Sequence, residues 1–273
     1  MRVLCIGEIV GKAGVFCVKT LLPDLKREFS VDFVIANGDG ATGGFGIGKS
    51  HAVYLHKLGV DVITGGDQLF FKKDMVPHLE SAFYVLRPAN LPPAAPGRGW
   101  RIFNAGDVRV AVISMLGQAG FDRMHGGNPF TYLPELASRA RADTPYVIVD
   151  YHANTTAEKN TMFHHMDGQV SAVVGTGTRV QTADATVRPG GTAVITDLGR
   201  TGSLDSVGGL DPGPELRKFL TQVPERSSDT WVTLELQGAL IDIDETGKAV
   251  SIEAVRRPCT ASTTGSDASA DSE

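Results

Sequence analysis

Hydrophobic residues along the chain gather in short continuous runs, separated by glycine-rich turns and by amphipathic segments. The runs that predict β-strands are 2–6, 32–36, 60–64, 108–115, 145–150, 171–174 and 192–196. The amphipathic segments that predict helices are 15–28, 49–58 and 72–81. Continuous apolar runs are typical of strands that are buried on both faces, as in a sheet that helices cover.

The carboxyl-terminal part of the chain follows a different pattern. Segments 231–244 and 249–255, with the turn Glu245-Thr246-Gly247 between them, predict a closing antiparallel pair. Strands that alternate with helices and end in a hairpin predict a layered α/β sandwich. We predict one domain over residues 1–259. Residues 260–273 contain no large apolar side chain and predict a disordered tail.

Composition narrows the class of protein. Of the 273 residues, 42% are hydrophobic and 21% are charged, which suits a substantial core in one large domain. The net charge of −5 argues against a basic surface that coats nucleic acid, but it is compatible with a nucleotide-sized ligand. The three cysteines are too scattered for a disulfide framework and indicate a reducing compartment. No run approaches the roughly 18 apolar residues of a membrane span, so we expect a cytoplasmic protein without membrane contact.

A glycine-rich segment matches the pattern of a phosphate-binding loop. Residues 43–50, Gly-Gly-Phe-Gly-Ile-Gly-Lys-Ser, fit G-x-x-x-x-G-K-[ST] at every position. Such a loop must leave its strand directly, so that its amides converge on the phosphates. Residues 37–42 intervene here and include an acid, Asp39, of the wrong charge. We therefore favour a flexible loop that enters a helix, and a P-loop nucleoside triphosphatase is the outlying alternative.

Acidic residues follow several of the predicted strands. Glu8, Asp39, Asp67 and Asp150 with His152 each come after an apolar run. Because ligands bind beyond the carboxyl ends of parallel strands, we expect these side chains to converge on one crevice. Two carboxylates at ~4 Å repel by about 4 kcal/mol at an effective dielectric of 20, so such a cluster needs a metal ion or an arginine. Oxygen ligands with one imidazole suit Mn²⁺, Mg²⁺ or Fe. The alternative is that each acid caps a helix or turn.

Eight short motifs occur in the order of one known family. They are Gly7-Glu8-Ile9-Val10-Gly11, Asn37-Gly38-Asp39, Arg87-Pro88-Ala89-Asn90, Asp150-Tyr151-His152-Ala153, Glu158-Lys159, Val174-Gly175-Thr176, 180–184 and 191–197. In this combination the chain resembles the bacterial 2′,3′-cyclic-nucleotide 2′-phosphodiesterases, which are calcineurin-like metallophosphoesterases. The resemblance implies a metallophosphoesterase-like sandwich of two β-sheets flanked by helices. It also implies a nucleotide or phosphodiester ligand and two metal ions whose bridging water attacks phosphorus.

Four metal-ligand positions of that family keep a donor atom in this chain. The resemblance places Glu8 where the family has an aspartate and Asp39 where it has the bridging glutamate. Asp67 keeps an oxygen donor in place of an asparagine, and His152 keeps the family's imidazole. A changed side-chain length shifts a ligand atom beyond the few tenths of an ångström that metal geometry tolerates, so compensation is needed.

Four further positions have lost the expected group. Gly40 replaces an asparagine, and Gly177 and Arg179 replace the two imidazoles of the last motif. Arg179 is a permanent cation that repels a metal ion. Gln68 replaces the histidine that would protonate the leaving group, and an amide is not a general acid at neutral pH.

These departures predict a degenerate dinuclear site. Our hypothesis is that Arg179 occupies the place of the first metal and balances Glu8 and Asp39; the alternative is that it points to solvent. At most one divalent metal (Mn, Mg or Fe), or none, would then bind beside His152. We predict a pseudoenzyme that binds a nucleotide or phosphate in a regulatory role. The alternative is an active one-metal phosphodiesterase that uses Glu8, Asp39, Asp67 and His152, and a homo-oligomer is compatible with either.

Overall fold

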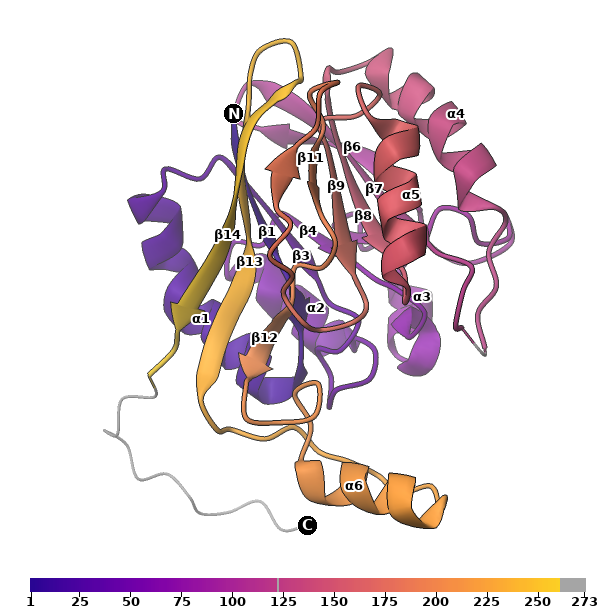
Figure 1. Cartoon of the computed structure of the whole chain (residues 1–273), viewed down its shortest axis with the longest axis vertical. Helices are drawn as coiled ribbons and strands as arrows, with labels where there is room; N and C mark the ends of the chain where they lie inside the picture. Colours follow the sequence, from indigo (N-terminus) through magenta and orange to yellow (C-terminus); the bar gives the residue numbers. More distant parts are fainter. Residues whose placement is uncertain (122, 261–273) are drawn as a thin grey trace.

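A computed structural model describes residues 1–121 and 123–260, in which helices cover two stacked β-sheets (Figure 1). The strands of the first sheet are β1 (Arg2–Ile6), β2 (Glu8–Ile9), β3 (Phe33–Asn37), β4 (Val62–Thr64), β5 (Val85–Leu86), β12 (Arg200–Ser203), β13 (Leu234–Ile243) and β14 (Ala249–Pro258). Their order is β2-β12-β13-β1-β3-β4-β5, with β14 paired to β13. Strands β1, β3, β4 and β5 are parallel, so their carboxyl ends lie at one edge.

The second sheet also has a parallel centre. Its strands are β6 (Trp100–Ala105), β7 (Val108–Leu116), β8 (Tyr146–His152), β9 (Ala172–Thr176), β10 (Thr186–Val187) and β11 (Ala193–Ile195). They follow the order β10-β11-β9-β8-β7-β6, and β7, β8, β9 and β11 are parallel.

Helices cover the outer face of each sheet. The first sheet packs against α1 (Gly11–Glu28), α2 (Lys49–Lys57), the 3₁₀ turn η1 (Leu69–Phe71) and α3 (Met75–His78). The second sheet packs against α4 (Pro129–Arg141) and α5 (Thr156–Met166). Along β1, Leu4 and Ile6 face the helices, whereas Val3 and Cys5 face the second sheet. The alternation of side chains along a strand therefore builds four layers, α/β/β/α.

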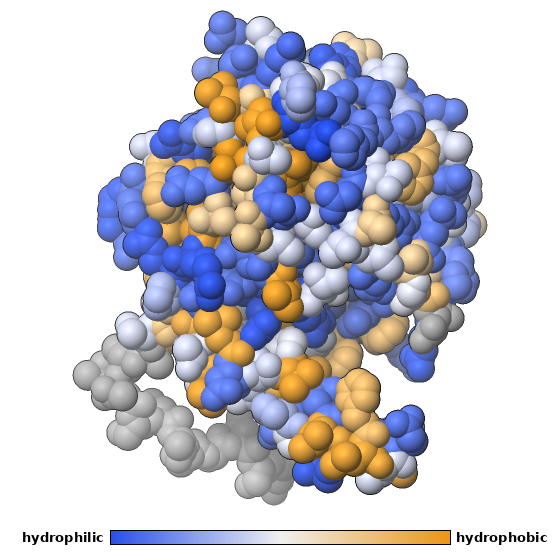
Figure 2. All heavy atoms as spheres, in the orientation of Figure 1, coloured by the Kyte–Doolittle hydropathy of each residue, from blue (hydrophilic) through white to orange (hydrophobic). Residues whose placement is uncertain are grey.

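Helix α6 (Pro212–Thr221) stands apart from these layers (Figure 1). None of its ten residues is buried, and Leu216, Phe219 and Leu220 are 60%, 78% and 73% exposed. Figure 2 shows the corresponding hydrophobic patch at the lower end of the molecule.

The structure confirms the predicted α/β sandwich and places a strand at each of the seven predicted runs. The predicted helix over 72–81 is too long, since α3 (Met75–His78) is the helix that the structure has in this range. The helix begins at Met75 instead, which puts Pro77 in its first turn. The predictions omit α4 and α6, although each begins with an Asx-Pro pair whose side-chain oxygen caps the helix.

Two further predictions concern the carboxyl terminus and the membrane. The predicted disordered tail, 260–273, lies outside the described residues except for Thr260, so it stays a prediction. In the described part of the chain, no helix combines the length and the apolar content needed to cross a bilayer.

Candidate functional site

The predicted site residues meet where parallel strands of both sheets end. Glu8, Asp39 and Asp67 follow β1, β3 and β4, His152 is the last residue of β8, and Arg179 follows β9. The two sheets therefore contribute to one edge, as expected for ligand sites in parallel α/β folds. We call the space between them the acidic cavity; it has a volume of about 310 Å³ and is lined by Glu8, Asp67, Gln68, His152, Asn154, Gly177 and Arg179.

Arg179 points into the acidic cavity and forms an ion pair with Glu8. Its Nε and Nη2 lie 2.8 and 2.5 Å from Glu8 Oε1, and the two side chains are 13% and 2% exposed. The guanidinium also donates to the carbonyl oxygens of Gly44 and Gly208, at 2.9 and 3.2 Å. Burial lowers the pKa of Arg179, but the charge and hydrogen bond of Glu8 together with the charges of Asp39 and Asp67 raise it overall, so the side chain stays cationic.

Asp39 is held by the backbone and not by Arg179. Its two carboxylate oxygens accept hydrogen bonds from the N–H groups of Gly66 and Gln68, at 2.7 and 2.9 Å. Among the described residues, Arg179 forms an ion pair with Glu8 and with no other carboxylate. The expected direct pairing of Arg179 with both acids therefore holds for Glu8 and is corrected for Asp39.

Gly40 provides the space that the guanidinium uses. A Cβ atom at position 40 would lie 2.9 Å from Arg179 Nη2 and 2.9 Å from Glu8 Oε1. Contacts this close force a shift, so a side chain at position 40 requires the Arg179–Glu8 pair to move from its observed position. The glycine and the arginine are thus linked sterically.

Asp39, Asp67 and His152 form a second group in the cavity, and one ligand atom from each lies within 4.8 Å of the others. His152 Nε2 lies 3.1 Å from Asp67 Oδ1 and 3.8 Å from Asp39 Oδ2. Burial lowers the pKa of His152, but the hydrogen bond with Asp67 and the charges of Asp39 and Glu8 raise it to about 9. Burial raises the pKa of Asp39 to about 7. In the absence of a metal, the imidazolium is therefore the cation that balances this group.

The proton on His152 Nδ1 is fixed by residues beneath the cavity. Nδ1 lies 3.0 Å from Thr176 Oγ1, and that hydroxyl donates its own hydrogen to Asp150 at 2.7 Å. Nδ1 must then be the donor, so Nε2 faces Asp67 and carries either a proton or a metal ion. Asp150 was expected to line the crevice; it lies below it instead, where Asn37 also donates to it at 2.9 Å. The sequence does not identify Thr176 as a partner of His152; the residue only forms part of the motif Val174-Gly175-Thr176.

The donor set of the second group fits one oxygen-preferring metal ion. It offers two carboxylates and one imidazole nitrogen, the combination that suits Mn²⁺, Mg²⁺ or Fe. Gln68 lines the same cavity, and its buried Oε1 accepts no hydrogen bond from any described residue. Position 177 is adjacent to His152, because a Cβ at this position would lie 3.4 Å from His152 Nε2. Gly177 itself has a φ of +108° and has no side chain to act as a metal ligand.

The loop that carries Arg179 is anchored by a buried ion pair that the sequence interpretation did not assign. Lys159 Nζ and Asp197 Oδ2 are 2.8 Å apart, and both side chains are 0% exposed. The same Asp197 oxygen accepts hydrogen bonds from the backbone N–H and the hydroxyl of Thr178, at 3.0 and 2.7 Å. Both residues lie within motifs of the family resemblance, and their contacts fix the residue that precedes Arg179.

The glycine-rich loop, residues 43–48, does not form a phosphate-binding loop. The N–H of Gly48 donates to Thr42 Oγ1 at 2.8 Å, and the N–H of Lys49 donates to Asp74 Oδ2 at 3.0 Å. The first amides of α2 are therefore occupied by side chains of the protein, one of them a carboxylate. This geometry disfavours the triphosphatase alternative.

Comparison with known proteins agrees with this architecture. A family model described as YmdB-like protein matches residues 4–255. The 2′,3′-cyclic-nucleotide 2′-phosphodiesterase of Bacillus subtilis (strain 168) is 38% identical over 256 residues, which cover 93% of this chain and 96% of that protein. A phosphatase crystal structure from Mycoplasma pneumoniae is 31% identical with a TM-score of 0.89 and covers 94% of this chain and 93% of that chain.

A more distant structure shares the fold alone. A 5′-nucleotidase precursor from Thermus thermophilus superimposes with a TM-score of 0.62 at 11% identity, covering 94% of this chain and 54% of that chain. The comparisons confirm the resemblance drawn from the motifs and the metallophosphoesterase-like sandwich that it implies. The chain belongs to the YmdB-like family, whose members here include a phosphodiesterase and a phosphatase.

Proposed function

We propose that this protein is a metallophosphoesterase homologue that has lost phosphodiester hydrolysis and binds a nucleotide or a small phosphodiester in a regulatory role. The observation that carries the proposal is the buried ion pair between Arg179 and Glu8. A guanidinium has donors and no lone pair, so it neither holds a metal ion nor activates a water molecule. We therefore assign to Arg179 the place of the first metal ion of related enzymes.

The remaining donors support at most one metal ion. Asp39, Asp67 and His152 would hold it, with His152 presenting Nε2 because Thr176 accepts the hydrogen bond from Nδ1. When bound, such an ion would supply a Lewis acid for a phosphate oxygen. Gln68 lines the same cavity but cannot deliver a proton to a leaving group.

A one-metal phosphodiesterase is the second candidate, and the cluster of Asp39, Asp67 and His152 favours it. The ligand class in both cases comes from the family. The Bacillus subtilis relative is named for its action on 2′,3′-cyclic nucleotides, so we propose nucleotides of this kind as ligands of this chain.

The metal content and the turnover of the full chain test this proposal together. The protein is stripped with EDTA and reloaded with Mn²⁺, and bound metal is counted by mass spectrometry. Hydrolysis of 2′,3′-cyclic AMP and of a chromogenic phosphodiester is measured alongside, with Asp39→Ala as the background control. We expect no more than one ion per chain and the same rate for the wild type and the control.

Three outcomes would decide against the proposal. Two ions per chain would show that Arg179 does not occupy a metal position. Turnover that disappears in His152→Ala would favour the one-metal enzyme. Turnover that persists in His152→Ala but disappears in Lys49→Ala would favour the glycine-rich loop as a phosphate-binding loop.

A further inference from the structure

A second cavity, which we call the basic cavity, also borders the glycine-rich loop. It has a volume of about 350 Å³ and is lined by Gly43, Phe45, Lys72, Arg226, Ser227, Ser228 and Asp229. Gly44, between two of these residues, accepts the hydrogen bond from Arg179, so one loop separates the two cavities. Lys72 follows η1, and residues 226–229 lie between α6 and β13.

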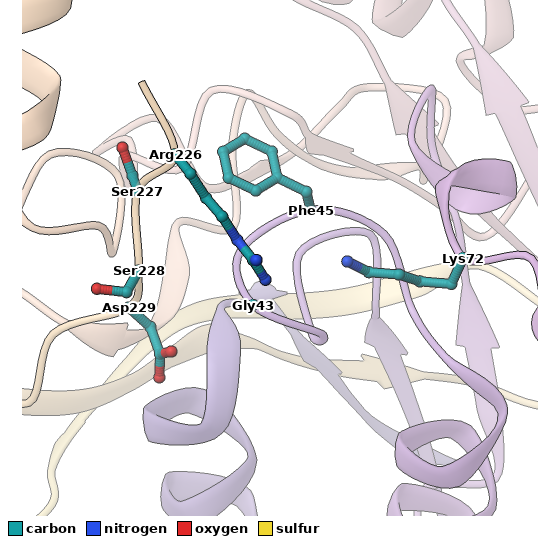
Figure 3. Close-up of a pocket in the computed structure, with 7 residues that line it drawn as sticks. All are labelled: Gly43, Phe45, Lys72, Arg226, Ser227, Ser228 and Asp229. Carbon is teal, nitrogen blue, oxygen red and sulfur yellow. The ribbon is translucent and has the colours of Figure 1, made fainter. Parts of the chain in front are cut away.

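Two cations face one another in the basic cavity. In Figure 3 the ammonium of Lys72 and the guanidinium of Arg226 point toward each other across the loop at Gly43, and the Phe45 ring lies beside them. Among the described residues, neither cation has a carboxylate within 4 Å. Facing cations repel one another, and a bound anion converts that repulsion into attraction.

Asp229, the one acid that lines the cavity, is engaged elsewhere. Its Oδ2 accepts a hydrogen bond from the N–H of Ala13 at 3.1 Å, in the first turn of α1. Its side chain also occupies the space that a Cβ of Gly11 would need, which packs the carboxylate against that helix. The helix N-terminus is a favourable place for a carboxylate, so Asp229 is already stabilised without Lys72 or Arg226.

We propose that the basic cavity binds a mononucleotide, with its phosphate between Lys72 and Arg226 and its base against Phe45. Arg226 offers a fork of donors for phosphate oxygens, and Lys72 offers a compact charge. The half-buried ring of Phe45 lines the cavity and provides a face on which any base can stack. The volume of about 350 Å³ is that of a small-ligand site.

The charge of the acidic cavity supports this placement. In the acidic cavity the cations Arg179 and His152 already pair with Glu8 and Asp67, and Asp39 lies beside them, whereas Lys72 and Arg226 of the basic cavity are free to attract a phosphate. The inference deepens the proposed function, because it locates the nucleotide that we propose as the ligand. It does not require the acidic cavity to be inactive, since the two are separate spaces.

Calorimetric titration of the full chain with AMP, adenosine and inorganic phosphate tests the assignment. We expect AMP to bind more tightly than either adenosine or phosphate. Lys72→Gln and Arg226→Gln should each weaken AMP binding at least tenfold, and Arg226→Lys should fall between wild type and Arg226→Gln. Phe45→Leu should weaken AMP binding and leave inorganic phosphate binding unchanged.

The matched control is Lys73→Gln. Lys73 is exposed, adjacent in sequence and absent from the cavity lining, so its loss changes net charge equally and should leave AMP binding intact. An equal loss in Lys73→Gln would reduce the effect to general electrostatics and overturn the proposal. Absence of AMP binding by the wild type would also overturn it, as would unchanged binding in Lys72→Gln and Arg226→Gln.

A further variant separates the two cavities. Arg179→Lys keeps the charge in the acidic cavity and removes the fork of donors. Loss of AMP binding in Arg179→Lys, with binding intact in Lys72→Gln, would move the phosphate to the acidic cavity and overturn this inference alone. Turnover or the binding of two metal ions would instead overturn the proposed function and leave the titrations of the basic cavity unaffected.

Discussion

The two cavities beside the glycine-rich loop balance their charge in opposite ways. In the acidic cavity, the carboxylates of Glu8 and Asp67 are paired with cations of the same chain, Arg179 and His152. In the basic cavity, Lys72 and Arg226 have no paired carboxylate among the described residues. Carboxylates that are paired with cations of the same chain need no ion from solution. Two unpaired cations, in contrast, can still attract an anionic ligand. The comparison therefore separates a cavity that stabilises the fold from one suited to binding.

The charged side chains of the two cavities also differ in how deeply they are buried. The side chain of Glu8 is 2% exposed and that of Arg179 is 13% exposed, whereas Arg226 is exposed to solvent. Breaking a buried ion pair leaves an uncompensated charge in a medium of low dielectric constant, whereas water screens an exposed charge. Substitutions in the two cavities should thus differ in their effect on stability as well as on binding.

The largest expected effect is the loss of the buried pair. Arg179→Ala should lower the free energy of unfolding by about 3–5 kcal/mol, because it leaves Glu8 buried without its cation. Arg226→Ala, the matched variant in the basic cavity, should change it by no more than about 0.5 kcal/mol. Urea denaturation followed by circular dichroism measures both. Similar losses in the two variants would remove the distinction between the cavities.

The double variant Arg179→Met with Glu8→Gln sharpens this result. It removes both charges and should recover most of the stability lost in Arg179→Ala, since the cost comes from the unpaired carboxylate. Failure to recover would mean that the hydrogen bonds from Arg179 to the carbonyl oxygens of Gly44 and Gly208 contribute most of the stability.

A smaller effect is expected from pH in the metal-free protein. The pKa of His152 rises from 6.5 to about 9 on folding, so its contribution is complete below pH 6.5 and is lost as pH rises through 9. The pKa of Asp39 rises from 3.8 to about 7, so stability also falls as pH rises across that lower range. At 1.36 kcal/mol per pKa unit, His152 alone accounts for about 3 kcal/mol.

Urea denaturation in EDTA between pH 6 and pH 10 measures this dependence. His152→Gln has no ionisable ring and should flatten the curve between pH 6.5 and pH 9. An equally steep decline in His152→Gln would show that the imidazolium does not balance Asp67 and Asp39. The acidic cavity would then depend on Arg179 alone for its internal cation.

The sequence predicts the convergence of the acidic cavity but not its pairing. Glu8, Asp39 and Asp67 can be placed together because parallel strands end at a common edge. The partners of Arg179 cannot be placed in this way, because two of them are carbonyl oxygens, of Gly44 and Gly208, whose direction depends on loop conformation. Backbone carbonyls carry no residue-type signal.

The basic cavity is harder still to predict from the sequence. Lys72 and Arg226 come from segments that are distant in sequence and belong to no helix or strand. An isolated lysine or arginine is most often a solvated surface residue, so neither position stands out. The glycine-rich segment was singled out for its resemblance to a phosphate loop. Its role in the structure is to border both cavities.

The smallest expected effect concerns the steric link between Gly40 and Arg179. Gly40→Ala adds a Cβ that would lie 2.9 Å from both Arg179 Nη2 and Glu8 Oε1, and it should lower the free energy of unfolding by about 1–3 kcal/mol. Gly127→Ala is the matched control, since the nearest atom to its Cβ would be 3.7 Å away. Denaturation of Gly40→Ala, Arg179→Ala and the double variant measures the coupling between the two positions.

In the Arg179→Ala background the contact with Nη2 is absent, whereas Glu8 Oε1 and the carbonyl oxygen of Ile9 would still lie 2.9 and 3.0 Å from the Cβ. The cost of Gly40→Ala should therefore fall without vanishing, and the two effects should not be additive. Additive effects would mean that the guanidinium moves aside at no cost. The two cavities would then no longer differ in whether their cation is held in place by the protein. A non-additive result combined with stoichiometric Mn²⁺ binding by Gly40→Asn/Arg179→His would instead show that these two positions together decide whether the cavity takes its cation from the chain or from solution.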